Sequence, residues 1–419
     1  MTSSLQVSTR QGSQIAPYRN PGQPENGLPT GQGLIGAGVI VGGYVQSLSQ
    51  TAPGSWSAPN IFGSTQYPAV QIVAANAPPI PGSGGPAVNS VNLFWTTGSG
   101  VMTTYLTSPT AWAEPQSVAG VPNLLWLQVA YTPAGNPVVY GVDSSGADAN
   151  LWTYKWSNGP GGGWSLTEYP SADMQWGGAP QGLSLLAQSE TGWVVFANST
   201  TANNLEAVQG TFGDQGGQTV TAIGEPTAGA FQWIVGGGVS TAQPSTTDPN
   251  WQQSVPCVFY VDPSMDLMMF PSTLNEDVAV SVVNAQAAYH NEFGNFPSIV
   301  TVNAYPNPTA SGLSAAGSTT TIYQVDGSSN VYALRQVAWV FDNRLPTFSP
   351  PTLIVAEGSL PLPAIGLAAD LRPADLPAVF IFDLEGNVYA YELCRPGTYS
   401  VTWNGTSASG LWAGAQVFV

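Results

Sequence analysis

The sequence predicts an all-β fold made of one repeated unit, and two observations lead to this prediction. In Val379–Leu393, apolar and polar residues alternate on both sides of Asp383-Leu-Glu-Gly-Asn387, as in two antiparallel strands joined by a tight turn. The pattern returns with starts near residues 39, 92, 139, 194, 258, 322 and 379, which are about 47 to 64 residues apart. One four-stranded blade needs about this length, so we expect a single β-propeller with seven blades, or six as the alternative.

Residues 1–33 precede the first repeat and are polar, with several Gly and Pro residues and no periodic pattern. This composition is typical of irregular backbone. We therefore expect two parts in the chain, an extended N-terminal arm over residues 1–33 and the propeller over residues 34–419.

The seven hairpins share one template, in which an apolar strand, a turn rich in Gly, Asn and Ser, and a second apolar strand follow one another. They differ in how clearly they show it. The clear copies are Val139–Tyr154, Val258–Phe270, Ile322–Leu334 and Val379–Leu393, and the weaker ones are Val39–Leu48, Asn92–Tyr105 and Trp193–Ala207.

An aspartate ends the first strand in the clear copies, at Asp143, Asp262, Asp326 and Asp383. Oxygen-rich turns can bind Ca²⁺, but none of these turns has the density of Asp residues that a dedicated calcium loop shows. An Asp that opens a turn also accepts hydrogen bonds from backbone N–H groups two residues on. We favour turn capping over calcium binding.

A tryptophan follows several hairpins at the entry to a further short strand. Trp56, Trp112 and Trp164 come after the first three hairpins, and Trp403 is a weaker echo after the last one. This tryptophan marks the second half of the repeat.

Residues 275–289 break the β pattern, because apolar residues recur there at helical spacing, acidic residues stand near the start, and Gly294 follows. We expect a short inserted helix near residues 278–290. A surface decoration is the favoured interpretation, and the cap of a pocket is the alternative.

Charge excludes several classes of partner. The net charge is −17, and the chain has one Lys and six Arg that are not clustered, whereas binding to nucleic acid phosphates needs clustered basic residues. The chain contains no run of about 18 apolar residues, so we expect no membrane-spanning helix. The N-terminus lacks the apolar segment of a signal peptide, so we expect either a cytosolic protein or export by a leaderless route.

The residue types required for most catalysis are scarce. His290 is the only histidine, and zinc or iron sites ordinarily need two or three His or Cys ligands. We therefore expect no metal and no cofactor. A catalytic pair of carboxylates cannot be singled out by spacing, although Glu292 is one candidate acid or base.

Aromatic residues give the positive signal for binding, since the chain has 14 Trp and 16 Tyr. Indole and phenol rings present an apolar face for stacking, while Asn, Gln and Ser supply uncharged hydrogen-bonding groups. This combination favours glycans or another small neutral ligand as the partner. Assembly into a homo-oligomer stays open.

The hairpin with Asp and Gly in its turn, followed by a Trp-Ser-x-Pro-like motif, resembles the tachylectin and fucose-lectin type of β-propeller. The likeness is carried by residues 139–164, 322–335 and 379–403, and by the Trp motif at 56–59 and 112–115. The resemblance implies sugar sites between adjacent blades. It therefore nominates Trp56, Trp112, Trp164 and Trp403 as sugar-binding residues.

Three functions follow as hypotheses. The first is a non-enzymatic lectin whose repeated weak sites act multivalently. The second is a lyase, cyclase or hydrolase with one pocket on the propeller axis. The third is a structural propeller that docks through its N-terminal arm.

Overall fold

The computed structural model describes part of the chain, and all statements below refer to that part. It comprises residues 15–24, 33–52, 55–63, 67–77, 90–108, 111–132, 135–143, 149–157, 163–174, 176, 180, 183–187, 189–198, 205–222, 233–242, 253–261, 267–271, 280–281, 300–306, 318–325, 331–340, 345–348, 352–355, 364–369, 378–383, 388–392 and 416–418.

The described strands pair into seven antiparallel sheets, and each sheet comes from one consecutive part of the chain. The first three sheets contain the strands with the most fully described side chains. The first sheet has β1 (Ile15–Pro24), β2 (Gly33–Val41), β3 (Tyr44–Ala52), β4 (Ser55–Trp56) and β5 (Asn60–Phe62); the second has β6 (Gln71–Ala77), β7 (Ser90–Thr97), β8 (Gly100–Ser108), β9 (Ala111–Trp112) and β10 (Gln116–Ser117); the third has β11 (Leu124–Tyr131), β12 (Pro137–Asp143), β13 (Leu151–Ser157) and β14 (Gly163–Tyr169).

The helix α1 (Ser171–Met174) connects the third sheet to the fourth. The remaining sheets repeat the same order of strands. The fourth sheet has β15 (Leu183–Ala187), β16 (Gly192–Asn198), β17 (Leu205–Thr211) and β18 (Thr219–Ala222); the fifth has β19 (Trp233–Ala242), β20 (Gln253–Val261), β21 (Leu267–Pro271) and β22 (Val280–Ser281); the sixth has β23 (Val300–Pro306), β24 (Ser318–Val325), β25 (Val331–Val340), β26 (Leu345–Phe348) and β27 (Thr352–Val355); the seventh has β28 (Ala364–Ala369), β29 (Ala378–Asp383), β30 (Val388–Glu392) and β31 (Gln416–Phe418).

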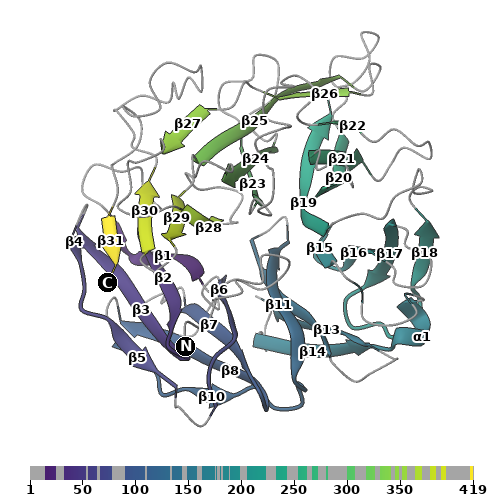
Figure 1. Cartoon of the computed structure of the whole chain (residues 1–419). Helices are drawn as coiled ribbons and strands as arrows, with labels where there is room; N and C mark the ends of the chain where they lie inside the picture. The colour runs from purple at the N-terminus through teal and green to yellow at the C-terminus, as the bar shows by residue number, and fades with distance from the viewer. Residues whose placement is uncertain are drawn as a thin grey trace, which may run out of the picture.

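The sheets are arranged in a closed ring (Figure 1). The first strand of each sheet contacts the first strand of the next, in the order β1, β6, β11, β15, β19, β23 and β28, and β28 contacts β1 again. Sheets that stand radially around an axis and bury their faces only against neighbours define a β-propeller. The predicted all-β propeller is confirmed.

The core is divided among the spaces between adjacent sheets. In β7, Val91, Leu93 and Trp95 pack toward the first sheet, whereas Phe94 packs toward the third. In β12, all seven residues are buried, because both faces of the strand are covered by neighbouring sheets. Each central strand therefore contributes alternate side chains to two cores. We call these spaces seam 1/2, seam 2/3 and seam 3/4 after the sheets they join.

Two glycines allow a large ring to lie flat on the neighbouring strand. Gly36 is paired with Tyr18, and Gly210 with Trp193. A Cβ atom on Gly36 would lie 2.2 Å from Tyr18 Cε2, and one on Gly210 would lie 2.2 Å from Trp193 Cζ2. Both rings are almost fully buried, so these two positions require the absence of a side chain.

The N-terminal segment differs from the expected arm. Ile15–Pro24 forms β1, which pairs with β2 along seven registered residues, and its side chains Ile15, Ala16 and Tyr18 are buried. The segment was missed because Pro17, Arg19 and Asn20 interrupt its apolar pattern. It is a strand of the first sheet and not a free arm.

The predicted helix near residues 278–290 is corrected at its start, where Val280–Ser281 forms β22 and pairs with Met268 and Met269 of β21. The remainder of that segment lies outside the described residues. Pairing with a sheet edge satisfies the hydrogen bonds of backbone N–H and C=O groups as well as a helix does. The spacing of apolar residues alone therefore did not distinguish a helix from a short strand here.

Candidate functional site

The three nominated tryptophans that the structure describes occupy equivalent places in their sheets. Trp56 pairs with Gln50, Trp112 with Leu106, and Trp164 with Trp156, in each case near the end of the third strand of the sheet. For Trp56 only the backbone is described, and Trp403 lies outside the described residues. The three described nominees therefore lie in three consecutive sheets and do not form one common site.

Trp112 lies in seam 1/2. Its ring meets Tyr18 and Phe62 of the first sheet edge-to-face, with centroid distances of 5.7 and 5.8 Å. The side chain is partly buried, and its Nε1 atom is buried without a hydrogen-bond partner among the described residues. Trp112 thus joins two sheets by packing, and its side chain remains partly exposed.

Trp164 has the corresponding place in seam 2/3. It stacks on Tyr154 at 4.9 Å with an interplanar angle of 11°, and it meets Phe94 of the second sheet and Trp156 edge-to-face at 5.1 and 5.4 Å. Burial raises the pKa of the Tyr154 hydroxyl, although the side chain is only half covered. The stacked pair forms an aromatic surface that is partly open at the seam.

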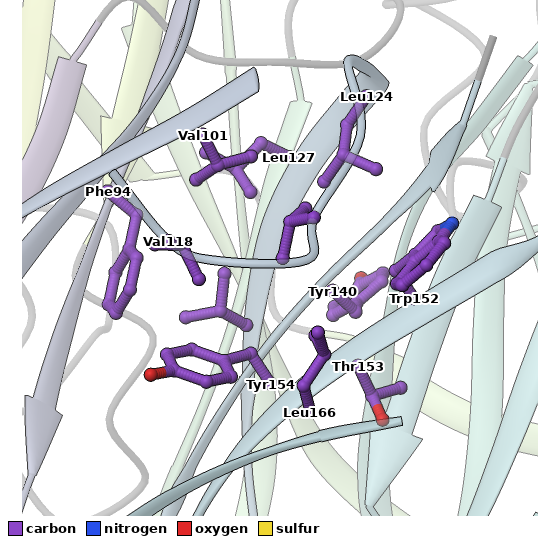
Figure 2. Close-up of a pocket in the computed structure, with 12 residues that line it drawn as sticks. Phe94, Val101, Val118, Leu124, Leu127, Tyr140, Trp152, Thr153, Tyr154 and Leu166 are labelled. Atoms are coloured by element: carbon purple, nitrogen blue, oxygen red, sulfur yellow. The ribbon is translucent and has the colours of Figure 1, made fainter. Parts of the chain in front are cut away.

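A hollow lies next to this pair, in seam 2/3 (Figure 2). The residues that line it include Phe94 in the second sheet, Val118 just after β10, and Tyr154 and Leu166 in the third sheet. Its free volume is about 20 Å³, which is room for about one water molecule. A pocket for a small molecule has at least about 300 Å³. The hollow is therefore a gap in the packing of seam 2/3, and any ligand of the aromatic pair must bind on the surface above it.

Seam 3/4 carries polar groups that the sequence analysis did not single out. Lys155 Nζ lies 3.8 Å from Glu190 Oε2 and 5.4 Å from the centroid of the Phe212 ring. Asn136 Nδ2 donates a hydrogen bond of 2.7 Å to Glu190 Oε2. These four residues come from the third and fourth sheets, and we call them the polar cluster. The one available signal was that Lys155 is the only lysine of the chain.

Asp143 illustrates the turn-capping prediction. Its carboxylate is buried and accepts hydrogen bonds from the backbone N–H of Asn150 at 3.0 Å, from Asn150 Nδ2 at 3.1 Å and from Trp152 Nε1 at 3.2 Å. Asn150 also donates to Glu168 and accepts from the backbone of Ser171. Asp143 therefore holds the ends of β12 and β13 together, as a turn cap does.

The other three aspartates of this pattern cannot be compared with Asp143, because Asp262 and Asp326 lie outside the described residues and only the backbone of Asp383 is described. His290 and Glu292 also lie outside. Across the ranges that the structure describes, no three His, Cys, Asp or Glu side chains are close enough to bind a metal ion together. Within those same ranges, no helix has the length and apolar character needed to cross a membrane.

Two buried tyrosines make hydrogen bonds inside the fold, one between two sheets and one within a sheet. Tyr140 donates to Gln128 Oε1 and accepts from the backbone N–H of Leu185, so its hydroxyl links the third and fourth sheets. Tyr18 in the first sheet bonds Ser47 Oγ and Ser49 Oγ at 2.9 and 2.8 Å. Burial raises the pKa of Tyr140 and of Tyr18 to about 12.

Comparison with known proteins agrees with the fold. No protein-family model matches the chain, and no curated protein matches it significantly. AofleA from Arthrobotrys oligospora has a TM-score of 0.50 at 9% sequence identity, over 96% of this chain and 94% of that one. The fucose-specific lectin from Aleuria aurantia has a TM-score of 0.46 at 10% identity, over 98% and 96% of the two chains. BBS1N in complex with ARL6DN has 0.46 at 8% identity, over 93% and 98%.

At such low identity a structural likeness describes the fold and not the function. The ring of sheets and the likeness to AofleA agree that this chain is a β-propeller protein. Propellers serve many unrelated functions, so function has to be argued from the side chains at the seams.

Proposed function

We propose that this protein is a carbohydrate-binding, lectin-like β-propeller whose sites lie at the seams between adjacent sheets. The observation that supports it most is the repetition of a half-buried tryptophan in the same place of consecutive sheets. Trp112 and Trp164 each contact the preceding sheet and are each partly exposed. A packing role alone does not require a tryptophan that remains partly open to solvent.

The chemistry of the seams fits neutral saccharides. Aromatic rings stack on the apolar faces of sugars, while backbone and uncharged side-chain groups bind hydroxyls. Because the hollow of seam 2/3 is too small for a sugar ring, we expect binding at this seam to be shallow and weak. Several weak sites on one rigid ring gain affinity together when a multivalent glycan reaches more than one of them.

The finer assignment belongs to the same proposal. We place the protein with the seven-bladed tachylectin and fucose-lectin type, and we assign sugar stacking to Trp56, Trp112, Trp164 and Trp403. Glycans are the proposed partner.

A glycan array that includes fucosylated, galactosylated and N-acetylglucosamine-containing glycans tests this function. Each hit is then titrated by calorimetry, and we expect weak binding with more than one site per chain. Trp112→Ala and Trp164→Ala should each lower the number of sites or weaken binding about tenfold, which corresponds to ~1.4 kcal/mol.

Trp126→Phe is the matched control, because Trp126 is partly buried against the core of seam 3/4 and is not a nominated binding residue. It should leave glycan binding unchanged. An array without any hit, obtained with protein whose fold is verified by circular dichroism, overturns the proposed function.

A further inference from the structure

Charged residues are distributed unevenly along the chain. The chain has 24 acidic residues and seven Lys and Arg residues, yet residues 27–142, more than a quarter of its length, contain only one of them, Glu114. This stretch contributes the first sheet from β2 onward, the whole second sheet, and β11 with most of β12 in the third sheet. The net charge of −17 is therefore carried almost entirely by the rest of the chain.

The large apolar side chains that remain exposed fall in the same stretch. Among the side chains that the structure describes, six are large, apolar and exposed, and all six lie between residues 41 and 125. They are Val41, Ile61, Tyr67, Val70, Tyr105 and Leu125. Single exposed apolar residues are ordinary on a soluble protein, whereas a group of them marks an interaction surface. Their significance therefore depends on whether they lie together.

Two of these side chains, Val41 and Val70, lie at the same end of the first two sheets. Val41 is at the turn that joins β2 to β3, and the carbonyl of Gly43 in that turn accepts a hydrogen bond of 2.8 Å from the N–H of Ala69. The N–H of Val70 donates to the carbonyl of Thr96 at 3.0 Å, beside the turn between β7 and β8. The segment before β6 is thus bonded to a turn of each sheet.

Gln71, the first residue of β6, extends this arrangement to the third sheet, which follows the second in the ring (Figure 1). Its Nε2 atom donates to the carbonyl of Leu125 at 2.6 Å, and its Oε1 atom accepts from the N–H of Leu127 at 2.8 Å. The exposed side chains of the two valines, of Tyr67 and of Leu125 therefore belong to one region across three sheets. We call Val41, Tyr67, Val70 and Leu125 the neutral face.

The surroundings of the neutral face are uncharged as well. None of residues 41–44, 67–71, 96–100 and 119–125 is charged. Arg19 of β1 pairs with Ile35, toward the other end of β2 from Val41. Glu114 follows β9, which pairs with the end of β8 that is distant from the turn between β7 and β8. The neutral face thus presents apolar side chains on backbone that is already held by hydrogen bonds, so little ordering is needed for binding.

We propose that the neutral face is the surface through which two copies of this chain associate. Two molecules with a net charge of −17 each repel one another, so close contact requires a surface that carries no charge. A two-fold interface brings the same patch of both copies together, and an uncharged apolar patch is complementary to itself. A basic partner would instead be attracted to the acidic remainder of the chain, and an acidic partner would be repelled by it.

Association through this face leaves the nominated tryptophans uncovered. Trp112 pairs with Leu106 and Trp164 with Trp156, and both pairs lie at the ends of β8 and β13 that are distant from the neutral face. Two copies joined by the neutral face would present these tryptophans at opposite ends of the dimer. The inference goes beyond the proposed function and does not depend on it, so glycan binding and self-association can be measured separately.

Sedimentation equilibrium and light scattering test the association, by comparing the measured mass with the 43.5 kDa of one chain. We expect the mass to rise toward that of two chains as the protein concentration increases. Raising NaCl from about 0.1 to about 1 M shortens the screening length from about 10 to about 3 Å and should tighten the association, because it weakens the repulsion between the two copies. A wild type that stays monomeric up to about 1 mM overturns the proposal, and so does association that weakens with salt, as an interface of ion pairs would.

Substitutions locate the interface. Val70→Glu places a carboxylate on both copies and should abolish association at low salt, and Tyr67→Ser should weaken it about tenfold or more. Tyr105→Ser is the matched control, because Tyr105 is 47% exposed and Tyr67 is 49% exposed, but Tyr105 lies toward the other end of β8. With folding verified by circular dichroism, association that survives both face variants, or that Tyr105→Ser weakens equally, refutes the assigned surface.

A neutral lipid surface is the other occupant that an uncharged apolar face admits, and vesicles of phosphatidylcholine are the probe for it. If the wild type is monomeric in solution and sediments with these vesicles, and Val70→Glu does not, the neutral face binds lipid and the proposed self-association is wrong. Trp112→Ala should leave the mass of the associated protein unchanged. Association without any glycan hit refutes the lectin function alone, and glycan binding by a protein that remains monomeric refutes the self-association alone.

Discussion

Replacing Tyr18 by Phe should make the protein less stable at neutral pH and less sensitive to alkali. The Tyr18 side chain is 1% exposed, and its hydroxyl lies within hydrogen-bonding distance of Ser47 Oγ, Ser49 Oγ and the carbonyl of Leu48. Removing the hydroxyl leaves these buried groups with one partner fewer. The expected loss in the free energy of unfolding at pH 8 is about 1 to 3 kcal/mol.

The pH dependence follows from the pKa of the same hydroxyl. Desolvation by burial raises the pKa of Tyr18 from 10.0 to about 12, and the hydrogen bonds from Ser47 and Ser49 lower it by less. Between these two values the unfolded chain has lost the tyrosine proton and the folded protein has kept it. The stability that the neutral Tyr18 hydroxyl contributes is therefore fully present below about pH 10. It is lost as the pH rises toward 12, and the loss in the free energy of unfolding is ~2.7 kcal/mol for this residue.

The assay is urea unfolding followed by tryptophan fluorescence at pH values from about 8 to about 12. The wild type should lose ~2.7 kcal/mol more than Tyr18→Phe between pH 10 and 12. Tyr105→Phe is the control, since Tyr105 is 47% exposed and its hydroxyl should add little to stability. Equal alkaline losses in wild type and Tyr18→Phe refute the reasoning, because they mean that Tyr18 ionises as easily in the folded protein as in the unfolded chain.

Two further substitutions test the packing and the turn cap. Gly210→Ala places a Cβ atom 2.2 Å from Trp193 Cζ2 and should lower the free energy of unfolding by about 1 to 3 kcal/mol. Gly216→Ala is the control, because its Cβ atom would have no atom within 4 Å, and it should change the free energy of unfolding by less than about 0.5 kcal/mol. Equal effects of the two substitutions in urea melts contradict the tight contact of Trp193 with this strand. Asp143→Ala leaves three hydrogen-bond donors of Asn150 and Trp152 without their acceptor and should lower the free energy of unfolding by about 3 kcal/mol. Asp214→Ala, at an exposed turn, is the control and should lower it by less than about 1 kcal/mol. If Asp143→Ala unfolds at the same urea concentration as the wild type, the capping role of Asp143 is refuted.

The repeat could be predicted because its central hairpins alternate in polarity around recognisable turns. The stretch Val379–Leu393 contains β30 and all but the first residue of β29, and these two strands pair in the seventh sheet. The first strand of each sheet was not visible in this way. In β15 (Leu183–Ala187) all five residues are buried, and β28 (Ala364–Ala369) reads as a short apolar run. A strand covered on both faces has no alternation, so a search for alternating patterns misses it.

The site was predicted in part. The recurrence of Trp after the third strand located Trp112 and Trp164, and the structure adds that both also pack against the preceding sheet. The polar cluster could not be predicted, because Asn136, Lys155 and Glu190 are brought together only by the contact between two sheets. Residues that are 19 and 35 positions apart in sequence carry no local signal of this proximity.

The way the ring closes has a mechanical consequence. Each sheet is made from one consecutive part of the chain, so the described strands of the first and seventh sheets meet through contacts of β1 with β28 and β29, with no strand shared between them. Every other seam is crossed by a connecting segment of the chain. The seam between the first and seventh sheets is thus the place where the ring can be opened without stretching the polypeptide. Pulled by its two ends, the molecule should part there first and then release its sheets one after another from either side.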